Sequence, residues 1–270
     1  GSIARELVET FEHKLAGTEL TVEDVRIGVF YTAVKLSDGH AGVAFTPRDQ
    51  ADTVCCPRSA GRMPASGKLK GSSVWKLLPY ATSDNSLQRA VGIAIVNALS
   101  ARLMETGPAP GAGVIMGADA LDAVSFRPED RVVLVGAFTP FIRKLRPLVQ
   151  ELLIIDRHPQ ALKPEEMAMW RAPERASEVL PLASVAVITG SAMVEGGLEE
   201  LLSFCHQTRE VVLAGPTASM WPEPLFRRGV TALGGITVRD ADRLLQVVGE
   251  GGSGYFFAGP ARKMAIVRDR

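Results

Sequence analysis

Apolar side chains fall on one face of a helical period at the start of the chain. The positions that follow this period are Ile3, Leu7, Val8, Phe11 and Leu15. Most of the intervening residues are charged, and Gly17 follows the last apolar position. A helical spacing with a glycine just beyond it is typical of an amphipathic helix and its end. We therefore expect a helix over residues 3–15.

Two β-rich stretches follow, and the residues between them predict a hairpin. Residues 25–36 and 40–46 contain many β-branched and aromatic side chains, and Ser37-Asp38-Gly39 separates them. An Asp-Gly pair between such stretches is a strong hairpin signal. We expect one strand in each stretch. Residues 47–71 then lose all periodicity, which predicts a long loop of the kind that often carries function.

The stretch 87–104 is apolar on almost every face. Between Ala90 and Ala101 only Asn97 and Ser100 are polar, and Asp84-Asn85-Ser86 offers several capping side chains. A helix that is apolar all round is buried on all sides. We expect this helix to lie between the hairpin sheet and the second half of the chain, followed by a linker over residues 106–117.

The second half of the chain alternates short apolar strands with helical patterns. The predicted strands are 131–135, 151–155, 184–188, 210–213 and 230–233, and the predicted helices are 140–149, 198–205 and 239–248. This alternation favours a parallel sheet covered on both faces. Residues 255–267 are predicted either to add an edge strand to that sheet or to return to the first domain.

These patterns predict the α/β fold class with two domains. A small α+β domain is expected over residues 1–106, and a Rossmann-like, doubly wound parallel sheet over 107–270. The length of 270 residues also fits two domains, because single domains most often contain about 100–150 residues.

Charge excludes several partners. The chain has 30 basic and 30 acidic residues and no block of like charge. There is no electrostatic footprint for nucleic acid or for an anionic membrane, and no apolar stretch reaches the roughly 18 residues of a membrane span. We expect a cytoplasmic protein with a small-molecule partner, and homo-oligomer formation stays open.

The cysteines do not have the spacing of a metal site. Cys55, Cys56 and Cys205 are the three cysteines of the chain. Structural zinc sites typically use pairs separated by two to four residues, whereas Cys55 and Cys56 are adjacent. We therefore predict no metal site within the protein. The odd number of cysteines also fits a reducing compartment.

Ligand-binding residues are expected at the carboxyl ends of the parallel strands, where open α/β sheets bind their ligands. Three of the four ends considered combine a glycine with a nearby hydroxyl group. The candidates at these ends are Gly136, Phe138, Thr139, Asp156, Arg157, Thr189, Gly190, Ser191, Gly215, Pro216 and Thr217. Thr139 is predicted to cap a helix that begins with Pro140.

The dinucleotide-binding fingerprint is absent. Phe138 and Phe141 occupy the positions of its second and third glycines, where they would obstruct a pyrophosphate. Asp156 follows Gly136 at the distance of a ribose-binding acid. It is expected to bind a nucleoside ribose, to cap a loop, or to pair with Arg157, and these alternatives stay open.

Three polar residues of the first half are candidates for the other wall of the site. Asn97 interrupts an apolar helix, and a buried amide without partners would cost about 1–3 kcal/mol. It either holds a neighbouring backbone or faces an interdomain cleft. Tyr31 and Thr32 raise the same choice between sheet packing and the rim of that cleft.

Several stretches together resemble one known family. They are GVFYTAV at 28–34, GVA at 42–44, GIAIVNA at 92–98, IDR at 155–157, ITGS at 188–191, GPT at 215–217 and GVTALGGITV at 229–238. This order of motifs resembles the bacterial and archaeal "putative heavy-metal chelation" family. The resemblance implies an enolase-N-terminal-like α+β domain, then a Rossmann-like domain similar to that of methyltransferases, with a cleft between them.

The family's activity is not established, and the resemblance implies pterin-like, flavin-like or metallophore-like ligands. Our leading hypothesis is that the chain binds such a chelator-type molecule in the cleft, with its chemical processing left open. Thr139, Thr189, Ser191 and Thr217 would hold anionic groups, and Asn97 would orient the ligand. A metal carrier or sensor and an S-adenosylmethionine-dependent methyltransferase are the alternatives. The catalytic residues, the cofactor and even the enzymatic nature of the protein stay unknown.

Overall fold

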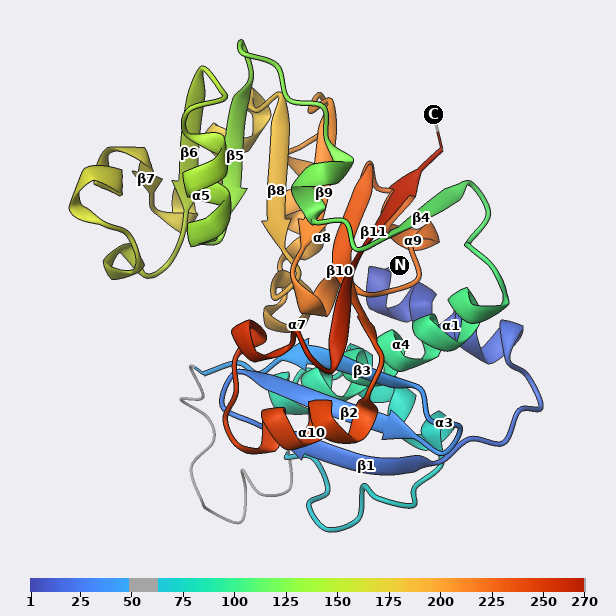
Figure 1. Ribbon diagram of the computed structural model, residues 1–270. Helices are drawn as coiled ribbons and strands as arrows, with labels where there is room; N and C mark the ends of the chain where they lie inside the picture. The colour runs from blue at the N-terminus through green and yellow to red at the C-terminus, as the bar shows by residue number, and fades with distance from the viewer. Residues whose placement is uncertain (49–62, 270) are drawn as a thin grey trace.

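The computed structural model describes residues 1–48 and 63–269, and it contains two separate sheets (Figure 1). A three-stranded antiparallel sheet has the order β1-β2-β3, and an eight-stranded sheet has the order β4-β11-β10-β9-β8-β5-β6-β7. The predicted α/β class is therefore confirmed. In the described part of the chain, no helix has both the length and the apolar character needed to cross a membrane.

The first helix is confirmed. α1 spans Ile3–Lys14, and the Oγ of Ser2 accepts a hydrogen bond from the backbone N–H of Arg5 at its start. Its apolar side chains are buried, and Gly17 adopts a positive φ of 77° just beyond the end. A helical period with a glycine after it was a sufficient signal here.

The single strand expected over residues 25–36 is wrong. The structure has two strands there, β1 (Val22–Ile27) and β2 (Tyr31–Leu36), which pair with each other. The chain turns at Gly28, whose N–H donates to the carbonyl of Tyr31. A Cβ on Gly28 would lie 2.2 Å from the carbonyl oxygen of Val248, so a distant segment determines this turn.

The hairpin at Asp38-Gly39 is confirmed, because it joins β2 to β3 (Ala41–Phe45). The buried helix is also confirmed as α4, Ser86–Thr106, with the side chain of Asn85 as its N-cap. Gly92 and Gly42 allow close packing on two sides of this helix. Cβ atoms there would lie 1.9 Å from the nitrogen of Ala81 and 2.3 Å from the carbonyl oxygen of Ala94.

Four strands of the large sheet lie within one residue of the prediction, the strand expected at 230–233 lies further along the chain, and the strand at residues 170–171 was not predicted. The strands are β5 (Arg131–Val135), β6 (Glu151–Ile155), β7 (Trp170–Arg171), β8 (Val185–Thr189), β9 (Glu210–Ala214) and β10 (Ala232–Val238). These six strands are parallel. Numbered along the chain, their spatial order is 3-2-1-4-5-6, which is the order of a Rossmann fold.

Two more strands extend this sheet, one where a linker was expected and one where either an edge strand or a return to the first domain was expected. β4 (Ala112–Met116) lies inside the predicted linker, and it pairs antiparallel with β11 (Ala261–Arg268). β11 lies between β4 and β10, so the C-terminal segment forms an inner strand and not an edge strand. A pattern with few charges and several glycines cannot reveal a strand that is completed by the other end of the domain.

The remaining helices are short, with one exception. They are α3 (Val74–Leu77), α5 (Thr139–Leu145), α6 (Ala176–Val179), α7 (Ala192–Glu195), α8 (Leu198–Ser203), α9 (Glu223–Phe226) and α10 (Ala241–Gly249). The short 3-10 segments include η1 (Leu78–Thr82), η2 (Ala120–Ala123), η3 (Pro159–Ala161), η4 (Pro164–Met169), η5 (Pro173–Arg175), η6 (Leu180–Leu182), η7 (Pro216–Ala218) and η8 (Gly254–Phe256).

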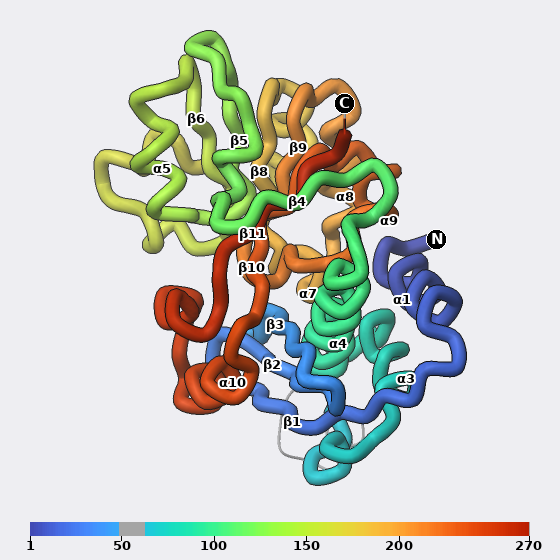
Figure 2. The backbone as a smooth tube through the Cα atoms, turned by 45° about the vertical axis from the view of Figure 1, so that its right-hand side comes forward, coloured from blue at the N-terminus to red at the C-terminus, as the bar shows by residue number. Residues whose placement is uncertain are grey.

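The longest of these helices, α10, covers a different sheet from the one expected. Leu244, Leu245 and Val248 form one buried cluster with Ala33 of β2 and Val43 of β3. Figures 1 and 2 both show α10 against the three-stranded sheet, on the side opposite to α4. A helix from the second half of the sequence therefore completes the core of the first sheet. The predicted division at residues 106 and 107 stays a prediction.

Candidate functional site

The strand order places a switch point between β5 and β8, where neighbouring connections leave the sheet in opposite directions. Gly136 directly follows β5 and has a positive φ of 111°. A Cβ on Gly136 would lie 3.1 Å from the ring of Phe138 and 3.3 Å from the Cβ of Thr189. The structure thus brings three of the predicted residues together at the position that the sequence indicated.

An aromatic pair borders this position. The rings of Phe138 and Phe141 are stacked with centroids 5.0 Å apart, and both side chains are half-buried. Thr139 is the first residue of α5, and Phe138 is its N-cap, without a side-chain hydrogen bond. The predicted cap by Thr139 is therefore wrong, because the helix begins one residue earlier than Pro140.

Asp156 holds two loops. One carboxylate oxygen accepts from the backbone N–H of Ala137 and the other from that of His158, each at 2.7 Å. The loop-capping alternative is therefore observed, and ribose binding stays a prediction. Arg157 pairs with Glu195, with 3.4 Å between Nη1 and Oε1.

Hydroxyl groups form a short chain at the end of β8. The hydroxyl of Thr189 donates to the Oγ of Ser191 at 3.2 Å, and Ser191 donates to the Oε2 of Glu195 at 3.0 Å. Glu195 thus joins Ser191 to Arg157, a role that the sequence reasoning missed. Its position four residues after Ser191 was the available signal, since residues four apart in a helical turn are neighbours.

Asn97 and Thr217 connect the two sheets. The Nδ2 of Asn97 donates to the carbonyl of Val43 at 2.7 Å and to that of Thr217 at 2.9 Å. The hydroxyl of Thr217 accepts from the N–H of Phe45 at 2.9 Å. Asn97 is 1% exposed and Thr217 is 3% exposed. Asn97 therefore holds neighbouring backbones, which was one of its two predicted roles.

Tyr31 and Thr32 also lie close to this junction. Thr32 is buried, and its hydroxyl lies 2.9 Å from that of Thr46. The ring of Tyr31 packs on Phe257 with centroids 5.1 Å apart. Burial raises the pKa of Tyr31 to about 12, so the phenol stays protonated at neutral pH.

The other predicted glycines have structural causes. A Cβ on Gly190 would lie 2.8 Å from the nitrogen of Ala218, so this glycine lets two strand-end loops pack together. Gly215 has a positive φ of 108° and open space around it, with Pro216 next in the chain. Its backbone conformation explains the glycine without a ligand.

Metal-ligating side chains do not cluster in the described part of the chain, where no group of three or more His, Cys, Asp or Glu is placed to hold a metal. Cys55, Cys56 and Arg58 lie outside the described residues. Cys205 is buried, and burial raises the pKa of its thiol to about 11. Its packing role agrees with its place just after α8.

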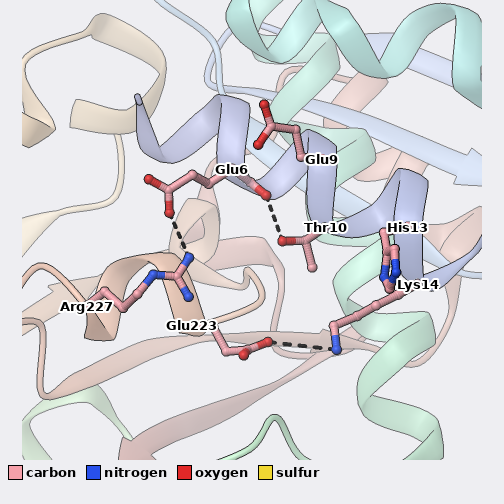
Figure 3. Close-up of a pocket in the computed structure, with 7 residues that line it drawn as sticks. All are labelled: Glu6, Glu9, Thr10, His13, Lys14, Glu223 and Arg227. Carbon is pink, nitrogen blue, oxygen red and sulfur yellow. Dashed lines mark hydrogen bonds and ion pairs between the residues drawn. The ribbon is translucent and has the colours of Figure 1, made fainter.

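A separate cavity of about 320 Å³ lies between α1 and the segment around α9 (Figure 3). Most of the charged side chains that line it are paired. Glu6 pairs with Arg227 at 2.7 Å and with Arg228, and Lys14 lies 4.0 Å from Glu223. The hydrogen bonds from Arg228 and Arg227 lower the pKa of Glu6 to about 2. Glu9 also lines the cavity, and it forms no ion pair with a described residue.

The fold and the switch point define a two-sheet α/β protein with a Rossmann strand order. Residues 119–267 match one family and residues 8–100 match another, and both are described as "Putative heavy-metal chelation". The chain therefore belongs to the family described as "Putative heavy-metal chelation". The resemblance inferred from the sequence motifs is therefore confirmed.

One curated protein is similar to this chain in sequence, and two solved structures share its fold. An uncharacterized protein of Methanocaldococcus jannaschii is 22% identical over 194 residues, which is 71% of this chain and 70% of that protein. A DUF364-family protein of unknown function from Pyrococcus horikoshii has a TM-score of 0.75 at 21% identity, with 97% of each chain covered. One from Desulfitobacterium hafniense has a TM-score of 0.73 at 20% identity, covering 98% of this chain and 99% of that one.

Proposed function

We propose that this protein binds a small chelator-type molecule at the carboxyl ends of β5 and β8, in the cleft expected between its two halves. The contact between Gly136, Thr189 and Phe138 at the switch point is the observation that carries this proposal. The glycine lets the ring of Phe138 and the side chain of Thr189 pack closely beside the strand end. This end of the strands is where open α/β sheets bind small molecules.

The side chains around Gly136 suit a planar heteroaromatic ligand with anionic groups. The half-buried ring of Phe138 offers a surface for stacking, which is worth about 0.5–1.5 kcal/mol beyond burial. The hydroxyls of Thr189 and Ser191 are hydrogen-bond partners for ring nitrogens or carboxylates. Arg157 supplies a positive charge at the rim, since its ion pair with Glu195 is long and exposed.

The residues of the junction have a supporting role in this proposal. Asn97 and Thr217 use their hydrogen bonds to hold the loop after β9 against β3. A Cβ on Gly254 would lie 3.6 Å from the hydroxyl of Tyr31 and 3.8 Å from the ring of Pro216, so Gly254 lies close to both residues. These contacts fix the distance between the two halves, and with it the width of the expected cleft.

A nucleoside ligand is a second candidate, because Asp156 follows the second strand of the Rossmann order. Both of its carboxylate oxygens already accept backbone hydrogen bonds, although each oxygen has room for one more. S-adenosylmethionine at a hundredfold excess over its Kd should then stabilise the protein by about 2.7 kcal/mol in thermal melts. An unchanged Tm at millimolar concentration excludes this candidate.

Fluorescence titration with pterin-6-carboxylate and with flavin mononucleotide tests the leading proposal. We expect Thr189→Val and Phe138→Leu each to weaken binding about fivefold to tenfold, because each removes an interaction worth about 1–1.4 kcal/mol. Thr231→Val is the matched control, since Thr231 bonds the backbone of Val211 at the opposite end of the sheet. Equal affinity in all variants, or no binding of either probe to the wild type, would contradict the proposal.

A further inference from the structure

A second cavity lies on the outer side of α5. It has a volume of about 450 Å³ and lies between α5 and the η4 segment, within the range of small-molecule sites. The polar residues that line it are Thr139, Arg143, Arg146, Lys163, Glu165 and Glu166. Figures 1 and 2 show the segment that joins β6 to β7 beside α5 in both views.

Helical spacing directs three of these side chains into the cavity. Thr139, Arg143 and Arg146 are four and three residues apart, so they share one face of α5. Lys144 is next to Arg143 in the sequence but lies on another face, where it pairs with Asp122 at 3.0 Å. One helix thus carries both a paired cation and two cations that point to the cavity.

The cations of the cavity have no carboxylate partners. Arg143, Arg146 and Lys163 form no ion pair with any residue of the described ranges 1–48 and 63–269, whereas Lys144 and many other basic residues do. Three unpaired positive charges around one cavity repel each other, and an anion bound between them would remove that repulsion.

Two carboxylates face the cations, and one of them is largely used by the protein itself. Glu166 is 8% exposed, and its Oε2 accepts from the backbone N–H of Lys163 at 3.0 Å. Its Oε1 forms no hydrogen bond to a described residue, and Glu166 is one of the residues that line the cavity. Glu165 is exposed. Three cations against two carboxylates leave an excess of positive charge.

We propose that this cavity binds the phosphate group of a small phosphorylated metabolite that also carries a hydroxyl group. The planar guanidinium groups of Arg143 and Arg146 match phosphate oxygens, and Lys163 adds a third charge. The hydroxyl of Thr139 donates at the open end of the helix face. The free Oε1 of Glu166 accepts from a ligand hydroxyl, which an inorganic anion lacks.

This site is independent of the proposed function. It shares only Thr139 with the predicted ligand residues, and the tests use different variants. Its ligand is recognised by charge and not by stacking on Phe138.

Isothermal titration at low salt with ribose 5-phosphate as the probe tests the site. We expect the single variants Arg143→Ala and Arg146→Ala each to weaken binding at least tenfold, while Lys144→Ala stays within twofold of the wild type. Each of the three variants removes one positive charge from the same segment, so an effect of overall charge would weaken binding equally in all of them. Equal weakening, or no binding of the probe to the wild type at millimolar concentration, would overturn the proposal. Both arginines are exposed, so we expect their variants to fold normally. An unchanged Tm verifies this, and a lowered Tm would reveal misfolding.

Comparison of probes identifies the ligand class. Ribose 5-phosphate should bind more tightly than inorganic phosphate, and free ribose should not bind. Citrate binding as tightly as ribose 5-phosphate would overturn the phosphate assignment. Glu166→Gln should tighten the binding of inorganic phosphate severalfold, because it removes a negative charge that faces the anion. An unchanged affinity in this variant would place the anion elsewhere and overturn the proposal.

Discussion

Asp130 joins the amino ends of three parallel strands. It is 1% exposed, and its carboxylate accepts two hydrogen bonds from Arg209 at 2.9 Å. Ser184 and the backbone N–H of Arg127 donate two more. Asp130, Ser184 and Arg209 each directly precede a strand. Burial alone would raise the pKa of Asp130, but these four donors lower it to about 2.

Asp130→Asn should lower the free energy of unfolding by about 2–3 kcal/mol at pH 7, because it leaves Arg209 without its charged partner. The stability that the carboxylate supplies is present above its ordinary pKa of 3.8 and is lost as the pH falls through about 2. Urea unfolding of both proteins should therefore show a difference that closes between about pH 4 and pH 2.

The matched control for Asp130 is Asp242→Asn. Asp242 is largely exposed and pairs with Lys35 at the surface. Its replacement should cost no more than about 1 kcal/mol. A stability difference for Asp130→Asn that persists at pH 2 would contradict the role assigned to its charge.

At the scale of elements, the surroundings of α4 explain its composition. The helix contacts β2 and β3 on one side and η1 on another. It reaches the second half of the chain through Arg89, whose Nε donates to the carbonyl of Val194 at 2.6 Å. Small residues such as Gly92 let backbone approach backbone, and an all-apolar helix follows from contact with several neighbours.

Gly92→Ala should destabilise the protein by about 1–3 kcal/mol, although alanine is the better helix former by about 1 kcal/mol. The new Cβ would lie 1.9 Å from the backbone nitrogen of Ala81, which cannot move as a flexible side chain can. Gly113→Ala is the control, because a Cβ there meets nothing within 4 Å. Thermal melts that rank the two variants in the opposite order would refute this packing argument.

At the scale of the molecule, the two sheets share their cores. α10 leaves the large sheet after β10 and buries Leu244, Leu245 and Val248 against the small one. The chain then returns to the large sheet as β11, between β10 and β4. Together with the hydrogen bonds of Asn97, this crossing ties the first half of the sequence to the last quarter.

Leu245→Ala should therefore weaken the first sheet, although it lies more than two hundred residues away from β1. We expect a loss of about 2–4 kcal/mol and faster amide hydrogen exchange over residues 22–45. Gln246→Ala changes the next, exposed residue of α10 and should leave exchange in that region unchanged. Slower or equal exchange in the Leu245 variant would show that the sheet is stable without α10.

Much of the fold could be predicted from local pattern. Four parallel strands are continuous apolar stretches because both faces of their sheet are buried; they are β5, β6, β8 and β9. The helix α4 is apolar all round because it is also buried on several sides. The candidate site was predictable in outline, because strand ends of such a sheet meet at one edge. Gly136 and Thr189 lie together there as a result.

The remaining features depend on segments far apart in the sequence. The turn at Gly28 exists because Val248 packs against it, and β4 is a strand because β11 lies beside it. The sequence left open whether Asn97 holds a neighbouring backbone or faces a cleft. Its hydrogen bonds to the carbonyls of Val43 and Thr217 appear only in the tertiary structure. The apolar spacing of α10 does not by itself indicate which sheet the helix covers. Period and composition specify which side of an element is buried, but the partner of that side depends on the packing of the whole chain.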